Sequence, residues 1–352
     1  MATILMTALV PTIGHKALID FGAQYVATQN IFPKYKSHTL HVIVSGRSFE
    51  PIALEERCKA LRLHYSSNIQ VVIHSHLDDA APQNPSTPGE WAYWKNVIKQ
   101  FHGTSPIISS ESYGKKLVSL FGDWDFVPFD EPRGIVPVKG SDVRKYHQYD
   151  NLLPEIKHLF QRKYTLFGQE SVGKTTLTNE LKNDFFEDAV SFLQEYARPY
   201  LEYKDNPQIT DQIMKNIFIG QYSLQMAAYK QGKEYFIQDT DLLSTIGYWL
   251  LWNPKARDLT YWPYLMYLFE RTKSNMYFLM SPEGVPFEPD PLRYGGDKRE
   301  TEMFYWEDLL KEFNCNYTIL EGSVDDRVRE FINFHDKNYE TPWTDLKSFV
   351  RE

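Results

Sequence analysis

Apolar runs of strand length alternate with helical patterns through the first part of the chain. The runs lie at 4–10, 40–45, 70–74, 105–109 and 124–128. Between the first two runs, a helical stretch carries its apolar residues on one face: Leu18, Phe21, Tyr25 and Val26. Strands that alternate with helices are typical of a parallel sheet with right-handed crossovers. We therefore expect a doubly wound α/β unit.

The same alternation starts again at Tyr164. Further apolar runs lie at 190–193, 235–238, 276–280 and 317–320, and long helical stretches separate them, the clearest at 211–231. Five runs again predict a complete doubly wound unit. Residues 145–162 read as a short helix and a connector, so we expect two parallel-sheet domains, at 1–155 and 156–352.

Composition narrows the class of protein. The chain of 352 residues is 42% hydrophobic and has no low-complexity block, which is typical of a globular enzyme of two domains. Its net charge of -8, with no basic stripe, argues against a nucleic-acid partner. Residues 1–10 are apolar but too short to cross a bilayer, so we expect no membrane span. Cys58 and Cys315 are far apart and lack the spacing of metal ligands, which fits a protein of the reducing cytoplasm. The sequence leaves open whether the chain forms a homo-oligomer.

A phosphate-binding loop follows the run that begins at Tyr164. Its residues are Gly168, Gln169, Glu170, Ser171, Val172, Gly173, Lys174, Thr175 and Thr176. The glycines let backbone N–H groups point at phosphate oxygens, Lys174 brings a cation to the β- and γ-phosphates, and the Thr175 hydroxyl suits Mg²⁺. The alternative is a glycine-rich turn that matches by chance, but the flanking strand and helix favour a nucleoside triphosphate, such as ATP.

Carboxylates follow the run at 235–238. Because that run ends beside the phosphate loop, we expect Asp239 to bind Mg²⁺ as a Walker B acid does. Asp241 is a candidate for substrate hydroxyls or for the waters of the metal. A helix N-cap is the alternative for one of the two.

A second candidate phosphate site lies in the first domain. Gly14 and His15 open a helix directly after the first run, where an imidazole can donate to phosphate oxygens. A capping or core histidine is the alternative. Near the end of the domain, Ser141 and Arg144 add a hydroxyl and a guanidinium at another helix start. Both elements should meet at the carboxyl edge of one sheet.

These elements resemble the nucleotidylyltransferase signatures H-x-G-H and I-S-x-T/S-x-x-R, with Thr12 where many members have the first His. Along nearly its whole length the chain is similar to NadR-type bifunctional proteins, which join a nicotinamide mononucleotide adenylyltransferase to a ribosylnicotinamide kinase. The segments 109–114 (SSESYG), 129–133 (FDEPR) and 138–144 (VKGSDVR) fall in the family's order, before the phosphate loop. The resemblance implies a Rossmann-like nucleotidylyltransferase followed by a P-loop kinase, without a DNA-binding segment because the chain starts on its first strand.

The same resemblance implies roles in adenylyl transfer. His15 holds the ATP phosphates, and Ser141 and Arg144 bind the β- and γ-phosphates. The remaining candidates that contact ATP or the pyridine nucleotide are Thr12, Gly14, Lys16 and Ser110.

In the kinase half, the resemblance places Glu195 and Arg198 in the acceptor pocket. Glu195 takes the proton of a ribose hydroxyl and Arg198 holds a phosphate, while a surface ion pair is the alternative. Which carboxylate is the base stays open. The Pro- and Gly-rich segment 286–299 matches the lid of small-molecule kinases. Its candidates are Asp290 for substrate and Arg293 and Arg299 for ATP, with a solvated loop as the alternative.

Trp91 and Trp94 are candidates to stack on a cationic nicotinamide ring, since an indole face attracts a positive ring. Core packing is the alternative for aromatic residues three apart on a helix. Arg47 is a candidate phosphate contact, with a plain surface arginine as the alternative.

The resemblance implies a two-step enzyme of NAD biosynthesis. The second domain phosphorylates nicotinamide riboside to nicotinamide mononucleotide (NMN) with ATP and Mg²⁺. The first joins NMN to AMP from ATP, giving NAD and pyrophosphate. Two alternatives stay open for the first domain: another phosphorylated acceptor, such as a phosphorylated pantetheine, or a regulatory module that only binds NAD or ATP, because Thr12 leaves one imidazole.

Overall fold

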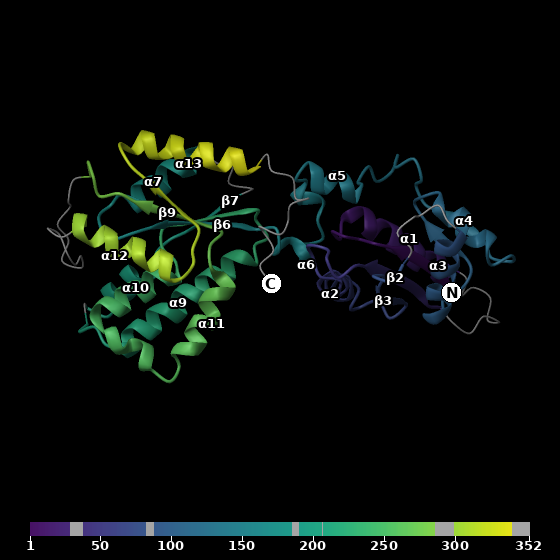
Figure 1. The fold of residues 1–352 in the computed structure, drawn as a ribbon, viewed down its shortest axis with the longest axis horizontal. Coiled ribbons are helices and arrows are strands. Elements are labelled where there is room, and N and C mark those ends of the chain that lie inside the picture. The colour runs from purple at the N-terminus through teal and green to yellow at the C-terminus, as the bar shows by residue number, and fades with distance from the viewer. Residues whose placement is uncertain (29–37, 82–87, 185–189, 206, 286–298, 340–352) are drawn as a thin grey trace. The chain divides into compact units, whose positions relative to one another are not determined.

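The computed structural model divides the chain into two compact units, Met1–Phe160 and a second that begins at Gln161 (Figure 1). It describes residues 1–28, 38–81, 88–184, 190–205, 207–285 and 299–339. The expected domain boundary at 155–156 lies a few residues before this division, because Ile156 and Phe160 are buried in the core of the first unit.

The first unit is a five-stranded parallel sheet in the order β3-β2-β1-β4-β5. Its elements are β1 (Ala2–Met6), α1 (Ile13–Thr28), β2 (Leu40–Gly46), α2 (Leu54–His64), β3 (Val71–Leu77), α3 (Pro88–Gln100), β4 (Ile107–Ser109), α4 (Tyr113–Ser119), β5 (Phe126–Pro128), α5 (Gly140–Lys145), the 3-10 helix η2 (Tyr149–Asn151) and α6 (Pro154–Lys157). All residues of β1 are buried, as in parallel strands covered on both faces.

The second unit is another five-stranded parallel sheet, in the order β10-β9-β6-β8-β7. Its elements are β6 (Arg162–Phe167), α7 (Lys174–Asp184), β7 (Val190–Leu193), α8 (Ala197–Tyr203), α9 (Asp211–Tyr229), β8 (Tyr235–Gln238), α10 (Leu242–Trp252), the 3-10 helix η3 (Pro254–Asp258), α11 (Trp262–Thr272), β9 (Met276–Met280), α12 (Arg299–Glu312), β10 (Tyr317–Leu320) and α13 (Val324–Tyr339).

In both sheets the first strand is central. β1 lies between β2 and β4, and β6 lies between β8 and β9, so the strand order reverses beside each. Ligands of open α/β sheets bind at the carboxyl ends of the strands next to such a reversal. The two expected doubly wound parallel-sheet domains are confirmed. No helix among the described residues is long and apolar enough to span a membrane.

Candidate active sites

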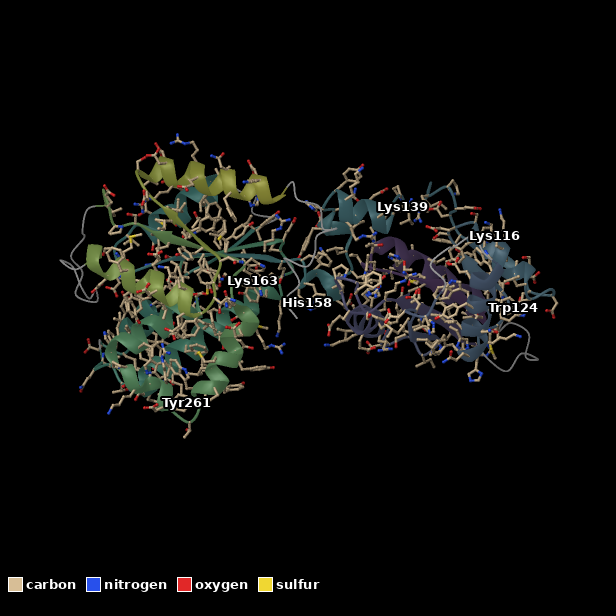
Figure 2. All side chains as sticks on the ribbon, in the orientation of Figure 1. Lys116, Trp124, Lys139, His158, Lys163 and Tyr261 are labelled. Carbon is tan, nitrogen blue, oxygen red and sulfur yellow. The ribbon has the colours of Figure 1, made fainter. Side chains whose placement is uncertain are left out.

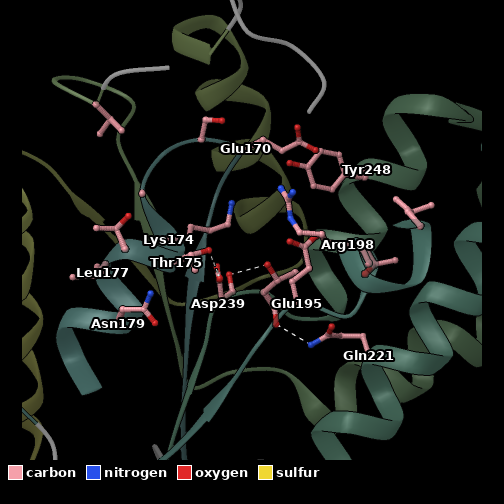
Figure 3. A pocket seen from close by; sticks show the side chains of 18 of the residues that line it. Glu170, Lys174, Thr175, Leu177, Asn179, Glu195, Arg198, Gln221, Asp239 and Tyr248 are labelled. Carbon is pink, nitrogen blue, oxygen red and sulfur yellow. Dashed lines mark hydrogen bonds between the residues drawn. The ribbon is translucent and has the colours of Figure 1, made fainter. Parts of the chain in front are cut away.

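A cavity of about 640 Å³ lies at the carboxyl ends of the strands of the second unit (Figure 3). Residues after all five strands line it, from the phosphate loop after β6 to the turn after β10. This volume is within the range of sites for small molecules. The predicted residues that line the cavity are Ser171, Gly173, Lys174, Thr175, Thr176, Glu195, Arg198 and Asp239.

The phosphate loop has the backbone conformation that its glycines predict. Gly168 has φ +127° and Gly173 has φ +85°, both in the region that L side chains rarely adopt. Lys174 reaches back over the loop and donates to the carbonyl oxygens of Gly168 (3.0 Å) and Gln169 (2.6 Å). Val172 instead turns its side chain into the core, where it is fully buried.

A hydroxyl and a carboxylate meet at the start of α7. The Oγ1 atom of Thr175 donates to Oδ2 of Asp239 at 2.5 Å (Figure 3). These are oxygen ligands of the kind that Mg²⁺ prefers, and Mg²⁺ usually takes its other ligands from water and substrate phosphates. Among the described residues, no group of three His, Cys, Asp or Glu forms a metal cage. Thr175 and Asp239 therefore fit a metal held jointly with a nucleotide.

Asp241 has a structural position instead of lining the described part of the cavity. It is the N-cap of α10, where its Oδ1 accepts from the backbone N–H of Leu243 (3.0 Å) and Ser244 (3.3 Å). Its Oδ2 accepts from the hydroxyl of Tyr277 (2.6 Å). Burial raises the pKa of Asp241 to about 6, against these hydrogen bonds, which lower it. The capping alternative therefore describes Asp241, and the expected substrate role does not match its placement.

The end of the cavity beside Glu195, where the acceptor is expected, includes side chains that the sequence did not single out. Gln221 is buried and connects two segments of the wall, because it accepts from Tyr196 N (2.8 Å) and donates to Thr240 O (3.1 Å). Burial raises the pKa of Tyr248 well above its ordinary value, and three nearby carboxylates raise it further: Glu170, Glu195 and Glu302. This end of the cavity therefore brings carboxylates and an aromatic ring together with the guanidinium of Arg198 (Figure 3).

The expected lid falls mostly outside the described residues. Asp290 and Arg293 lie in the undescribed range 286–298. Arg299 begins α12, but its side chain is also outside the described part.

A second cavity, of about 430 Å³, lies in the first unit at the carboxyl ends of β1 and β4. The predicted residues that line it are Thr12, Gly14, His15, Trp91, Trp94, Ser110, Ser141 and Arg144. The structure thus brings the two elements of the expected adenylyltransferase site together. Gly14 is required by close packing, since a Cβ there would lie 2.6 Å from the carbonyl oxygen of Val138.

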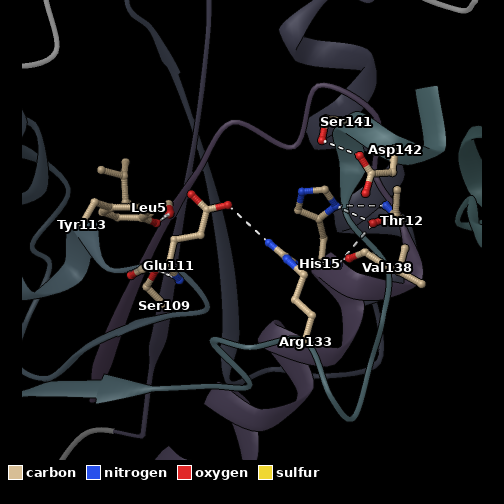
Figure 4. Close-up of polar contacts among 10 residues, drawn as sticks. All are labelled: Leu5, Thr12, His15, Ser109, Glu111, Tyr113, Arg133, Val138, Ser141 and Asp142. Atoms are coloured by element: carbon tan, nitrogen blue, oxygen red, sulfur yellow. Dashed lines mark hydrogen bonds and ion pairs between the residues drawn. The ribbon is translucent and has the colours of Figure 1, made fainter. Parts of the chain in front are cut away.

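His15 is held by the start of its own helix (Figure 4). The backbone N–H of Thr12 donates to Nδ1 of His15 at 3.2 Å, and the N–H of His15 donates to Thr12 Oγ1 at 3.4 Å. This is the reciprocal pattern of a capping box, with an imidazole in place of the usual carboxylate. Burial lowers the pKa of His15 to about 4, and the cations of Arg133 and Arg144 lower it further. The ring is therefore neutral at pH 7.

Arg133 is a residue of this cavity that the sequence did not assign. Its guanidinium donates to Glu111 Oε1 (3.2 Å) and to the carbonyl of Val138 (3.0 Å) (Figure 4). Asp130 shapes the preceding turn by accepting from three backbone N–H groups, those of residues 134, 135 and 136. The sequence feature that could have pointed to Arg133 is the cluster of acidic and basic residues in the FDEPR segment. That segment served only to show that the motifs follow the order of the family.

Trp91 and Trp94 both pack against an apolar cluster and line the cavity. Both are partly buried against the apolar cluster around Leu5 and Ile98, and both border the cavity. Lys116 lies over the ring of Trp91, with Nζ 5.8 Å from its centroid. The core and the site alternatives therefore both describe this pair.

Three basic residues differ in their relation to the cavity. Lys16 forms an ion pair with Asp20, and Arg47 lies 3.7 Å from Asp78. Neither lines the described wall of the cavity. Lys139, labelled in Figure 2, is exposed at the start of α5 and does line it.

Comparisons with known proteins agree with this architecture. A family model described as "AAA domain" matches residues 163–327. The chain is 24% identical over 308 residues to "Trifunctional NAD biosynthesis/regulator protein NadR" of Escherichia coli (strain K12), covering 82% of this chain and 66% of that protein. It is also 24% identical over 285 residues to the protein of the same name from Salmonella typhimurium, covering 75% and 64%. The chain thus spans less than two thirds of the length of these relatives.

Two solved structures share the fold over almost the whole chain. "Crystal structure of NadR protein in complex with NR" has a TM-score of 0.70 at 17% identity and covers 96% of both chains. "Crystal structure of NadR protein in complex with NAD and AMP-PNP" has a TM-score of 0.69 at 18% identity and covers 97% of this chain and 96% of that one. The resemblance to NadR-type proteins is confirmed.

Proposed function

We propose that this chain, similar to NadR proteins over most of its length, is a bifunctional enzyme of NAD biosynthesis. The second domain phosphorylates nicotinamide riboside with ATP, and the first transfers AMP from ATP to the resulting NMN, giving NAD and pyrophosphate. The observation that carries the proposal is a pair of separate cavities, each with phosphate-binding groups at a reversal of strand order. The product of one step is the phosphate monoester that the other step needs as its nucleophile.

The second cavity supplies the parts of a phosphoryl transfer. The loop from Gly168 to Lys174 binds the β- and γ-phosphates through backbone N–H groups and an ammonium. Thr175 and Asp239 would hold Mg²⁺, which would supply positive charge to the transferred phosphoryl group. Glu195 accepts the proton of the ribose 5'-hydroxyl while the hydroxyl oxygen forms a bond to the γ-phosphorus of ATP. The bond from that phosphorus to the oxygen that bridges it to the β-phosphate breaks, and ADP leaves.

The acceptor end of this cavity suits nicotinamide riboside. Its nicotinamide ring carries a positive charge, which the carboxylates of Glu170 and Glu195 at this end can attract. The phenol ring of Tyr248 offers a face for the cation. Arg198 lies where it can bind the phosphate of the product.

The first cavity supplies cationic and hydrogen-bonding groups for adenylyl transfer. An oxygen of the NMN phosphate attacks the α-phosphorus of ATP, and pyrophosphate leaves with the bridging oxygen. Since Nδ1 of His15 accepts from the Thr12 N–H, the ring carries its proton on Nε2, which can donate to a phosphate oxygen. Arg144 and Ser141 bind the leaving phosphates, and Arg133 adds a second guanidinium beside them.

A second candidate for the first domain is a regulatory module that binds NAD or ATP without turnover. Thr12 favours the regulatory module, because a second histidine at this position would give adenylyl transfer another hydrogen-bond donor to the oxygens of the pentavalent phosphorus. The test is to give the purified chain Mg²⁺ and ATP with one acceptor at a time. We expect ADP with nicotinamide riboside and pyrophosphate with NMN. No pyrophosphate above background with NMN would support the regulatory module, and release with phosphopantetheine alone would support the other acceptor.

A further inference from the structure

Arg327 occupies a position where a cation is unfavourable unless something else requires it. It lies in the first turn of α13 and is 2% exposed. The positive end of a helix dipole repels a cation there, and burial lowers the pKa of its guanidinium. A capping box fixes this turn, since Ser323 N donates to Asp326 Oδ2 (3.1 Å) and Asp326 N donates to Ser323 Oγ (3.2 Å).

The guanidinium of Arg327 binds backbone carbonyls from three loops of the kinase cavity. Its Nε donates to Gly322 O (3.0 Å), one terminal nitrogen donates to Val172 O (2.9 Å), and the other donates to Ser281 O (2.8 Å). These carbonyls follow β10, β6 and β9, respectively. The guanidinium presents its N–H donors as a rigid planar fork that spreads toward carbonyls of three loops, whereas the three N–H donors of a lysine ammonium all radiate from one atom.

The bond to Val172 fixes one peptide unit of the phosphate loop. The carbonyl of Val172 and the N–H of Gly173 belong to the same planar, trans peptide, so they point in opposite directions. While Arg327 holds the carbonyl, the N–H of Gly173 points away from the guanidinium. Gly173 lines the cavity and has φ +85°. Because glycine has no side chain, its own steric contacts do little to hold this peptide in one orientation.

We infer that Arg327 is a positioning residue for triphosphate binding: it holds the Val172–Gly173 peptide so that the Gly173 N–H faces the phosphates of the nucleotide. The inference rests on the ATP site of the proposed function. It predicts that Arg327 contributes to affinity through the phosphates and little through the adenosine part. A residue that only stabilised the fold would affect both parts alike.

Hydrogen–deuterium exchange of the full chain tests this, because it reports each site separately. Peptides that cover 168–176 are followed during titrations with ATP, ADP and adenosine, each with Mg²⁺. The variants are Arg327→Met, Arg327→Lys and the control Arg329→Met, which removes an exposed cation of the same helix. We expect Arg327→Met to weaken ATP and ADP by about tenfold or more, and adenosine by less than about twofold. Arg329→Met should match the parent chain.

The same data separate failure of the inference from failure of the proposed function. If ATP protects 168–176 in the parent and equally in Arg327→Met, the inference is wrong and the ATP site stands. Equal weakening of all three ligands would also overturn it. If ATP does not protect 168–176 in the parent, both are wrong. Should Arg327→Met unfold the second domain, Arg327→Lys decides: loss of ATP affinity with retained adenosine affinity supports the inference, and parent-like affinities overturn it.

Discussion

The backbone N–H of Thr12 and the Nδ1 atom of His15 lie 3.2 Å apart, and the hydroxyl of Thr12 lies 2.8 Å from the same nitrogen. Since a backbone N–H can only donate, Nδ1 is an acceptor, and the proton of the neutral ring is on Nε2. Thr12 thus sets both the tautomer and the orientation of the imidazole. The hydroxyl at this position supports the one histidine of the motif instead of replacing a second one.

Thr12→Val should therefore slow adenylyl transfer. The valine keeps the backbone donor but removes the hydroxyl that contacts Nδ1 and caps the N–H of His15, at a cost of about 1 kcal/mol in the stability of the first domain. We expect kcat for pyrophosphate release to fall by about tenfold, with phosphorylation of the riboside unchanged. Thr12→Ser should retain most of the rate. A parent-like kcat in Thr12→Val would show that the hydroxyl does not orient the ring.

Asp239→Asn should abolish most of the kinase activity. The amide keeps the shape of the side chain but loses the charge that we propose to bind Mg²⁺ beside Thr175, so we expect kcat to fall by about a hundredfold or more. A titration with Mg²⁺ should also show a weaker apparent affinity for the metal. Asp258→Asn, at an exposed carboxylate of η3, is the control. Unchanged Mg²⁺ dependence in Asp239→Asn would remove Asp239 from the metal site.

Trp94→Leu should weaken the binding of NMN. The ring borders the first cavity, and a cation on an indole face is stabilised by about 1–2 kcal/mol, so we expect KM for NMN to rise by about tenfold at constant KM for ATP. Trp124→Leu is a matched control, because Trp124 stacks on Phe121 with ring centroids 3.9 Å apart and does not border the described cavity (Figure 2). An equal rise of KM in the two variants would assign Trp94 to packing.

The second domain should lose stability on mild acidification through His335. Burial lowers the pKa of His335 from 6.5 to about 4, and its ring packs against Tyr235 with centroids 4.6 Å apart. The unfolded chain binds the proton near pH 6.5, whereas the folded chain binds it only near pH 4. The contribution of the neutral His335 ring to the free energy of unfolding is therefore complete above pH 6.5 and is lost as the pH falls toward 4. Calorimetry of His335→Phe should show a smaller drop in melting temperature over this range. A drop equal to that of the parent would contradict the linkage.

The strands of the second domain were predictable because apolar residues dominate them, although the edge strands β7 and β10 are only partly buried and the inner strands β8 and β9 are almost fully buried. The apolar runs predicted at 190–193, 235–238, 276–280 and 317–320 coincide with β7, β8, β9 and β10. Each is a short run of aromatic, branched and other apolar residues with few polar interruptions, so the pattern has clear ends. The phosphate loop was equally predictable, since its glycines and Lys174 lie within one short segment of the sequence.

The first strand shows where the pattern misleads. The run at 4–10 predicts a strand, but β1 ends at Met6. Ala8 and Val10 are buried in the loop that borders the cavity, and Ala8 has φ +39°. An apolar residue buried by a loop looks like a strand residue in sequence, so hydrophobicity alone cannot separate the two.

Tyr248 and Arg327 could not be assigned to a site from sequence. Each reaches the cavity of the second unit from a helix distant in sequence from the phosphate loop, as Arg327 does toward Val172. Asp239 and Asp241 show the converse limit: both follow one strand, and only the register of α10 makes one of them a helix cap.

The most direct measurement of the central claim is product analysis with nicotinamide riboside and ATP in three forms of the chain. The parent should convert the riboside to NAD. Lys174→Ala should leave the riboside unchanged yet make NAD when given NMN, because it loses the ammonium at the phosphate loop and keeps the first cavity. His15→Ala should accumulate NMN. If His15→Ala makes NAD at the parent rate, or Lys174→Ala still phosphorylates the riboside, the division of two reactions between two cavities is wrong.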